Sequence, residues 1–203
     1  IGHRTTVLLE DIDIFKYHLV VTERKEGLIQ LRIINWSDRK EHYIEFNDAA
    51  YNAYSFSNPE FDTDVLRYGY TSMRTPQTTY DYNMNDRSQE LLKQQEVLGG
   101  EFSEDNYTTE RIMSTSRDGA KVPLSIIYKK GTKLDGKAPL LLYAYGSYGY
   151  SMDASFSSIR LFLLLFLFFA FLARRKKNYR CYYTHRLRDS VSPVCRIFNS
   201  GCT

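Results

Sequence analysis

The chain has 203 residues, enough for one large domain or parts of two. Hydrophobic residues make up 43% and aromatic residues 15%, so a core is possible and strands are favoured, because aromatic rings pack well on a pleated sheet. The formal net charge of +3 indicates no particular class of partner.

Charge is distributed unevenly along the chain. Residues 1–173 contain 19 basic and 23 acidic residues, whereas residues 174–203 contain 8 basic residues and one acid, Asp189. All three cysteines also lie in this last stretch, with spacings that fit no zinc pattern. The break indicates that the tail was not selected together with the rest of the chain.

Neither a secreted protein nor a metal site is expected. The N-terminus has no secretory signal, and the first 180 residues contain no cysteine that could form a disulfide, so we expect a cytoplasmic protein. The four histidines stand far apart without an H-E-x-x-H pattern, so we expect no metal and no other cofactor.

Residues 17–83 indicate two successive units of short strands separated by turns. Leu28–Asn35, for example, alternates apolar and polar residues as a half-buried strand does. The predicted strands are Tyr17–Glu23, Leu28–Asn35, His42–Phe46, Tyr51–Ser57, Leu66–Ser72 and Thr78–Asn83. Two units of roughly forty residues are typical of propeller blades, although a β-sandwich would give similar spacing.

The pattern changes after a polar, Gly-containing linker. Thr109–Ser116 and Val122–Tyr128 flank Asp118-Gly119, and Asp-Gly is a strong hairpin signal. Further on, Leu140–Ala144 is an unbroken apolar run, which favours a strand covered on both faces, as inside an α/β sheet.

Two stretches nearly match catalytic motifs. Gly131–Ala138 is close to a P-loop, but Ala138 lacks the hydroxyl that would hold magnesium, so a surface turn is predicted. Tyr145–Gly149 is close to the nucleophile elbow G-x-S-x-G. Because Tyr145 stands where the first Gly is needed for a tight turn, Ser147 is not expected to be a nucleophile.

Leu161–Ala173 is an apolar run of thirteen residues, followed by the basic cluster Arg174–Lys177. A helix that spans a bilayer needs about twenty apolar residues, so a membrane segment is not expected. A membrane-tethered β protein that uses residues 161–177 stays an alternative. The aromatic residues near the basic cluster follow no pattern, so no nucleic-acid partner is expected.

Four stretches, in this order and spacing, resemble the prolyl oligopeptidase family and within it the oligopeptidase B group. They are Leu66–Pro76, Ser116–Pro123, Pro139–Gly149 and Ser155–Leu161. The resemblance covers roughly residues 10–161. It implies a mixed fold, in which antiparallel β-propeller blades are followed by the first strands of an α/β-hydrolase domain. The implied segments are the last blades (1–92), a linker (93–108) and the start of the hydrolase domain (109–161).

The resemblance also implies chemistry and site residues. The family cleaves short peptides with a Ser-Asp-His triad through an acyl-enzyme, and the oligopeptidase B group cleaves after basic residues. Tyr145 matches the tyrosine whose hydroxyl helps to form the oxyanion hole. Asp153 lies where some members carry an acid that favours basic substrates, and Ser155 stands where a second acid can appear.

After Leu161 the sequence departs from the family. Triad residues follow the oxyanion strand in α/β-hydrolases, and residues 162–203 contain no match to them. We therefore expect a non-family tail from a shifted reading frame, with Leu161–Ala173 helical at best and loosely packed. We also expect a chain that is inactive alone. The remaining alternative is a propeller-type binding module without chemistry.

Overall fold

The computed structural model describes residues 2–98, 100–145, 148 and 150–164. The chain divides into two compact units. The first comprises Ile1–Lys130 together with Asp153–Ser158, and the second comprises Gly131–Met152 and Ile159–Thr203. The short segment 153–158, named the strap below, therefore belongs to the first unit although both of its flanks belong to the second.

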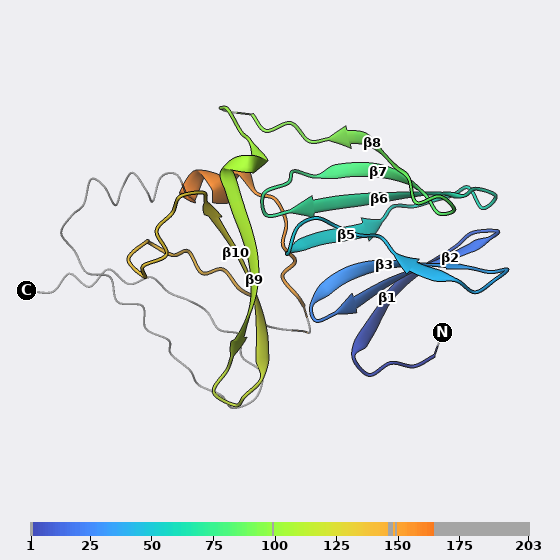
Figure 1. Ribbon diagram of the computed structural model, residues 1–203, viewed down its shortest axis with the longest axis horizontal. Helices are drawn as coiled ribbons and strands as arrows, with labels where there is room; N and C mark the ends of the chain where they lie inside the picture. Colours follow the sequence, from blue (N-terminus) through green and yellow to red (C-terminus); the bar gives the residue numbers. More distant parts are fainter. Residues whose placement is uncertain (1, 99, 146–147, 149, 165–203) are drawn as a thin grey trace, which may run out of the picture. The chain divides into compact units, whose positions relative to one another are not determined.

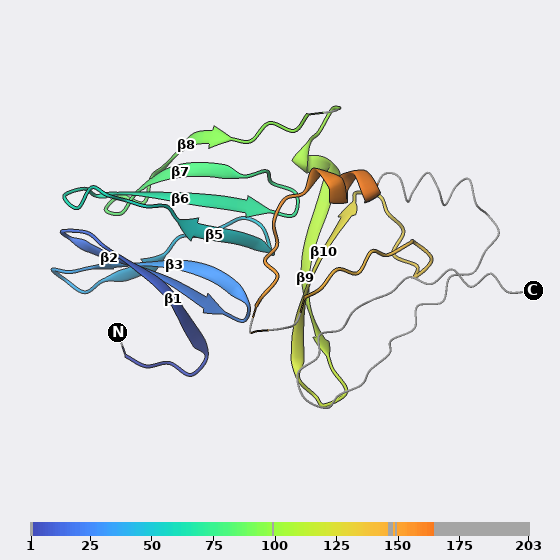
Figure 2. The same cartoon turned by 180° about the vertical axis from the view of Figure 1, so that it is seen from behind.

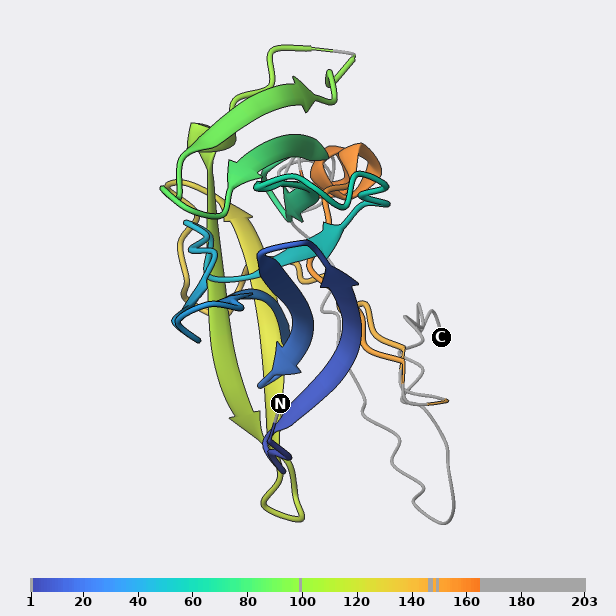
Figure 3. The same ribbon diagram turned by 90° about the vertical axis from the view of Figure 1, so that its right-hand side faces the viewer.

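The described part of the first unit holds two four-stranded antiparallel sheets and a two-stranded hairpin (Figure 1). The sheet orders are β1-β2-β3-β4 and β5-β6-β7-β8, and β9 pairs with β10. Figure 3 shows the twist of these strands. The elements are β1 (Val7–Ile14), β2 (His18–Lys25), β3 (Leu28–Asn35), β4 (Glu41–Tyr43), β5 (Tyr51–Ser55), β6 (Val65–Ser72), β7 (Thr78–Asn83), β8 (Gln89–Gln94), the 3-10 helix η1 (Glu104–Asn106), β9 (Tyr107–Thr115) and β10 (Lys121–Lys129).

Tight turns set the register of the hairpins. Lys25 pairs with Leu28, so Glu26 and Gly27 alone connect β2 to β3. Both have positive φ, 51° and 78°, as a type I′ turn requires, and glycine adopts such a φ without steric cost. The predicted Asp118-Gly119 hairpin is confirmed, because β9 and β10 pair on either side of it.

The core of the first unit lies between the two four-stranded sheets. In Figures 1 and 2 these sheets lie against each other, with β3 next to β5. This core takes alternate residues of β3, β5 and β6, together with one buried residue each of β2 and β7. The buried members of this cluster are Phe15, Val20, Leu31, Ile33, Ile44, Tyr51, Ala53, Leu66, Tyr68, Tyr70, Tyr82 and Met84. Each fully buried large side chain contributes about 1.5–3 kcal/mol relative to exposure, so this layer is the main stabilising element.

The predicted strands between residues 17 and 83 are confirmed, with ends that shift by a few residues. Thr78–Asn83 has the predicted bounds, whereas the predicted His42–Phe46 shortens to β4 (Glu41–Tyr43). Two strands were not predicted, β1 and β8. β8 is exposed along its whole length, and most of β1 is exposed as well, so neither shows the alternation of a half-buried strand.

The predicted strand at Leu140–Ala144 is wrong. The described residues of the second unit contain no strand, and Leu140 leaves 77% of its surface exposed. A strand of an α/β sheet is stable only with hydrogen-bonded neighbours and covered faces, and the described residues of this unit provide neither. An apolar run alone therefore does not produce the strand.

The apolar run near the end is described only in part. Residues 158–164 are helical, and Leu161 is buried. Residues 165–203, which include most of the run, the basic cluster and the cysteines, lie outside the described residues. Among the residues described, no helix has the length and apolar character needed to cross a membrane.

Candidate functional site

Tyr145, the expected oxyanion donor, lies in the second unit at the end of the apolar run. Its ring meets the ring of Tyr150 edge to face, with centroids 5.8 Å apart and an interplanar angle of 82°. Tyr145 is 48% exposed. Ser147, the serine of the near-miss elbow, lies outside the described residues.

Asp153, the expected substrate-binding acid, lies in the strap of the first unit and is paired with an arginine. Its carboxylate accepts hydrogen bonds from Arg24 Nη1 at 2.5 Å and from Arg24 Nη2 at 3.1 Å. Arg24 also donates from Nε to Glu10 at 2.5 Å. The hydrogen bond to Asp153 is the main cause that raises the pKa of Arg24. A basic substrate would therefore meet a carboxylate that already holds a cation.

The rest of the strap contacts the second sheet and the segment before η1. The backbone N–H of Phe156 donates to Thr71 Oγ1 in β6 at 3.1 Å. The Phe156 ring meets that of Phe102 edge to face at 5.3 Å. Ala154 is buried between these contacts and Asp153. Because Arg24 belongs to β2, the strap is attached to both four-stranded sheets.

A buried acid that the sequence analysis missed joins the second sheet to β9. The carboxylate of Asp48 accepts from Tyr70 Oη at 2.8 Å and from Arg74 Nε at 2.6 Å. It also lies 3.2 Å from Thr75 Oγ1 and 3.3 Å from Thr109 Oγ1. Burial alone would raise the pKa of Asp48, but the hydrogen bonds from Arg74 and Tyr70 outweigh it and lower that pKa.

Part of this network was visible in the sequence. Tyr70, Arg74 and Thr75 all fall within the stretch Leu66–Pro76, which carries the family resemblance. Asp48 gave no signal, because it lies in a loop and its partners come from β6, the β6–β7 loop and β9. Its role follows only from tertiary contacts.

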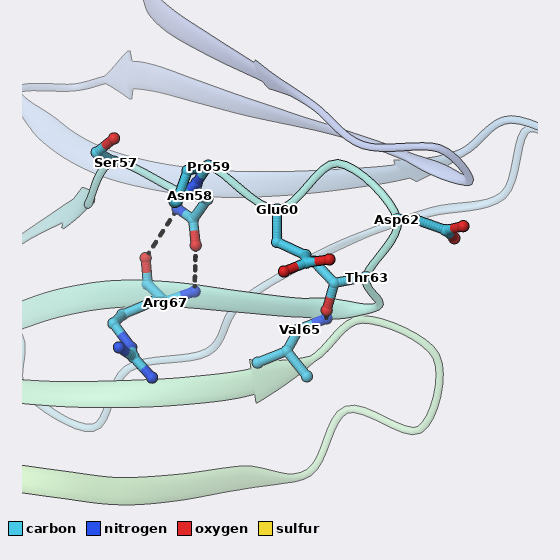
Figure 4. Close-up of a pocket in the computed structure, with 8 residues that line it drawn as sticks. All are labelled: Ser57, Asn58, Pro59, Glu60, Asp62, Thr63, Val65 and Arg67. Carbon is cyan, nitrogen blue, oxygen red and sulfur yellow. Dashed lines mark hydrogen bonds between the residues drawn. The ribbon is translucent and has the colours of Figure 1, made fainter.

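A shallow hollow lies over the loop between β5 and β6 (Figure 4). Two of its polar residues, Asn58 and Arg67, bind each other. Asn58 accepts from the backbone N–H of Arg67 at 2.8 Å, and its Nδ2 donates to the carbonyl of Arg67 at 3.2 Å. The Arg67 guanidinium makes two bonds of 2.7 Å to Asp81. The hollow therefore offers a ligand no free polar partner among these groups.

Within the described part of the chain, no three His, Cys, Asp or Glu side chains are grouped so that they could hold a metal ion.

Comparisons with known proteins place these elements in context. Residues 1–95 match the family described as "Prolyl oligopeptidase, N-terminal beta-propeller domain". The chain is 44% identical over 165 residues to dipeptidyl aminopeptidase BI of Pseudoxanthomonas mexicana, which covers 81% of the chain and 22% of that protein. It is 32% identical over 156 residues to protease 2 of Moraxella lacunata, covering 77% of the chain and 22% of that protein.

Solved structures show the same similarity. Oligopeptidase B from Trypanosoma brucei, in a closed form with covalently bound antipain, aligns with a TM-score of 0.72 and 29% identity over 81% of the chain and 24% of that protein. Oligopeptidase B from Leishmania major aligns with a TM-score of 0.71 and 30% identity over 79% of the chain and 24% of that protein. The chain thus spans about a fifth to a quarter of the length of these relatives.

Proposed function

Because this chain belongs to the prolyl oligopeptidase family, we propose that it supplies the last propeller blades of a serine oligopeptidase and the oxyanion donor of the hydrolase domain that follows. One observation carries the proposal. The residues that match the propeller domain fold into two consecutive four-stranded antiparallel sheets, each with its strands in sequence order.

In the proposed reaction, a serine hydroxyl attacks the scissile carbonyl of a short peptide and forms an acyl-enzyme, which water then hydrolyses. The hydroxyl of Tyr145 would donate to the oxygen that becomes negative in each tetrahedral intermediate. Its exposure supports this role, since a buried hydroxyl could not reach a substrate. The proposed boundaries are blades at 1–92, a linker at 93–108 and the start of the hydrolase domain at 109–161.

The proposed substrates are short peptides cleaved after basic residues, with Asp153 as the acid that attracts the basic side chain. A carboxylate with 23% of its side-chain surface exposed supports this role. The chain carries no match to the triad, so we propose that it does not hydrolyse peptides by itself.

The test is a graft into a complete relative. Residues 10–161 would replace the corresponding segment of the Pseudoxanthomonas mexicana dipeptidyl aminopeptidase BI. The graft and the 203-residue chain would be assayed on a dibasic fluorogenic peptide and on an uncharged peptide of equal length. We expect hydrolysis by the graft, faster on the dibasic peptide, and none by the chain alone. A folded graft without activity would overturn the proposal, and turnover by the chain alone would overturn its predicted inactivity.

A further inference from the structure

Three segments of the first unit surround the guanidinium of Arg24 with acceptors. Glu10 binds Nε, and Asp153 binds both Nη1 and Nη2. The backbone carbonyl of Gly27 accepts from Nη1 at 3.1 Å. Only 12% of the Arg24 side chain is exposed. Together these groups form a receptor for a planar guanidinium, and the chain's own arginine occupies it.

Two of the three acceptor groups are held by the first sheet, one in a bulge and one in a turn. Glu10 is the extra residue of a β-bulge, where the pairing of β1 with β2 shifts between Leu9 and Asp11. A bulge changes the direction of a side chain. Here the carboxylate of Glu10 lies against Arg24 and accepts a hydrogen bond from its Nε. Gly27 belongs to the type I′ turn between β2 and β3. These two acceptors are therefore fixed by the first sheet.

Asp153 differs from them because it comes from the strap, outside any sheet. Its side chain keeps 23% of its surface exposed. A carboxylate offers about four hydrogen-bonding positions, and Arg24 uses two of those on Asp153. Asp153 can therefore accept a second cation while Arg24 stays in place, or can exchange one cation for the other.

We propose that Arg24 is an internal competitor for Asp153 and so determines how strongly this protein selects peptides with an arginine side chain. This inference rests on the proposed function and names a residue that tunes it. The positive charge of Arg24 repels an incoming guanidinium and offsets the charge of Asp153. Arg24 acts through Asp153, so it is a positioning residue for specificity and takes no part in bond cleavage.

The test measures binding by the full 203-residue chain and needs no activity. The probe is a blocked dibasic peptide, acetyl-Gly-Arg-Arg-amide, titrated by calorimetry. Its counterpart with both arginines replaced by citrulline has a similar shape without charge. For Arg24→Gln we expect about tenfold tighter binding of the arginine peptide than for the wild type, and no change for the citrulline peptide. Arg24→Lys keeps the charge but loses the bidentate geometry, so we expect a smaller gain in affinity for the arginine peptide.

Two control variants make the result specific. Arg67→Gln removes a second bidentate arginine, the partner of Asp81 in the other sheet, and should leave peptide affinity unchanged. Adding Asp153→Asn to Arg24→Gln should abolish the gain. A purely structural role for Arg24 predicts equal or weaker binding in both Arg24 variants, and that outcome overturns the inference. If Arg24→Gln does not fold, as judged by circular dichroism, the peptide affinity of Arg24→Lys alone decides whether the inference holds.

The outcome is separable from that of the graft. Unchanged affinity in the Arg24 variants beside an active graft overturns only the inference about Arg24. A gain in affinity that depends on Asp153 beside a folded but inactive graft supports the guanidinium site and overturns the peptidase proposal.

Discussion

The hydroxyl of Tyr70 in β6 donates to the buried carboxylate of Asp48, in the loop that precedes the second sheet, over 2.8 Å. The same carboxylate lies 3.3 Å from the hydroxyl of Thr109 in β9. One acid thus connects a propeller-type sheet to the β9–β10 hairpin. The Tyr70 hydroxyl has a raised pKa, chiefly because it is buried, so it stays protonated and remains a donor.

Replacing Asp48 should destabilise the first unit. Asp48→Ala leaves the Tyr70 hydroxyl and the Arg74 guanidinium without their acceptor. Loss of one partner of a fully buried pair costs about 3–5 kcal/mol; because Arg74 is partly exposed, we expect about 2–3 kcal/mol. The free energy of unfolding in urea measures it. Tyr70→Phe, the control that removes one hydrogen bond, should cost about 1 kcal/mol. An Asp48→Ala protein as stable as the wild type would contradict the role assigned to this acid.

Mild acid should lower the stability of the first unit through His18. His18 is buried, with Nδ1 3.5 Å from Asp64 Oδ1. Burial lowers its pKa below the ordinary 6.5, and this outweighs the attraction of Asp64, which raises it. The unfolded chain therefore binds a proton before the folded chain does. Stability is complete above pH 6.5 and falls as the pH drops from 6.5 towards the folded pKa.

The measurement is the thermal unfolding midpoint between about pH 7.5 and pH 5.5, across the range in which histidine titrates. The wild-type midpoint should fall on acidification, and the fall should shrink in His18→Asn. His42, whose pKa is also lowered chiefly by burial, should contribute in the same direction. If the midpoint rose on acidification in the wild type but not in His18→Asn, the sign assigned to His18 would be wrong.

Gly69 should resist substitution because a tyrosine ring covers it. Gly69 pairs with Tyr54 across β5 and β6, and a Cβ at Gly69 would lie 2.5 Å from Tyr54 Cζ. Gly69→Ala therefore forces the ring to move, and we expect a loss of about 1–3 kcal/mol in unfolding free energy. In a Tyr54→Ala background the clash is absent, so the same change should cost much less. Equal costs in both backgrounds would show that the ring is not the obstacle.

Tyr145→Phe in the graft should lower kcat by about a hundredfold with little change in KM, since the hydroxyl would act on charge that exists only in the transition state. Steady-state kinetics on the dibasic peptide measure both constants. Tyr143→Phe is the matched control, because Tyr143 is an exposed tyrosine of the same run. A raised KM with unchanged kcat would assign Tyr145 to substrate binding instead.

The alternation of apolar and polar residues and the turn residues were enough to predict most strands of the two sheets. They failed for β8, whose residues are all exposed, because an edge strand has no buried face to mark it. They also failed at Leu140–Ala144, where composition suggested a strand but hydrogen-bonded neighbours are absent among the described residues of that unit. Propensity is a property of one segment, whereas a strand forms only when a second segment pairs with it.

The candidate site was predictable to a smaller extent. Tyr145 and Asp153 came from motif resemblance, and their roles stay predictions. The partner of Asp153 could not be predicted, because Arg24 lies far from it in sequence. The contact of Glu10 with Arg24 could not be predicted either, because it depends on a bulge. The role of Asp48 was hidden for the same reason, since its donors come from separate elements.

The strap has a consequence for the order in which the chain folds during synthesis. Every strand of both four-stranded sheets pairs with its neighbour in sequence. The strands of each sheet can therefore pair as soon as they have left the ribosome. The contacts Arg24–Asp153 and Thr71–Phe156 join residues 129 and 85 positions apart. Arg24 therefore waits without Asp153 until more than a hundred further residues have been translated, and a nascent chain that stalls before residue 153 would expose the receptor groups on the first sheet to other chains.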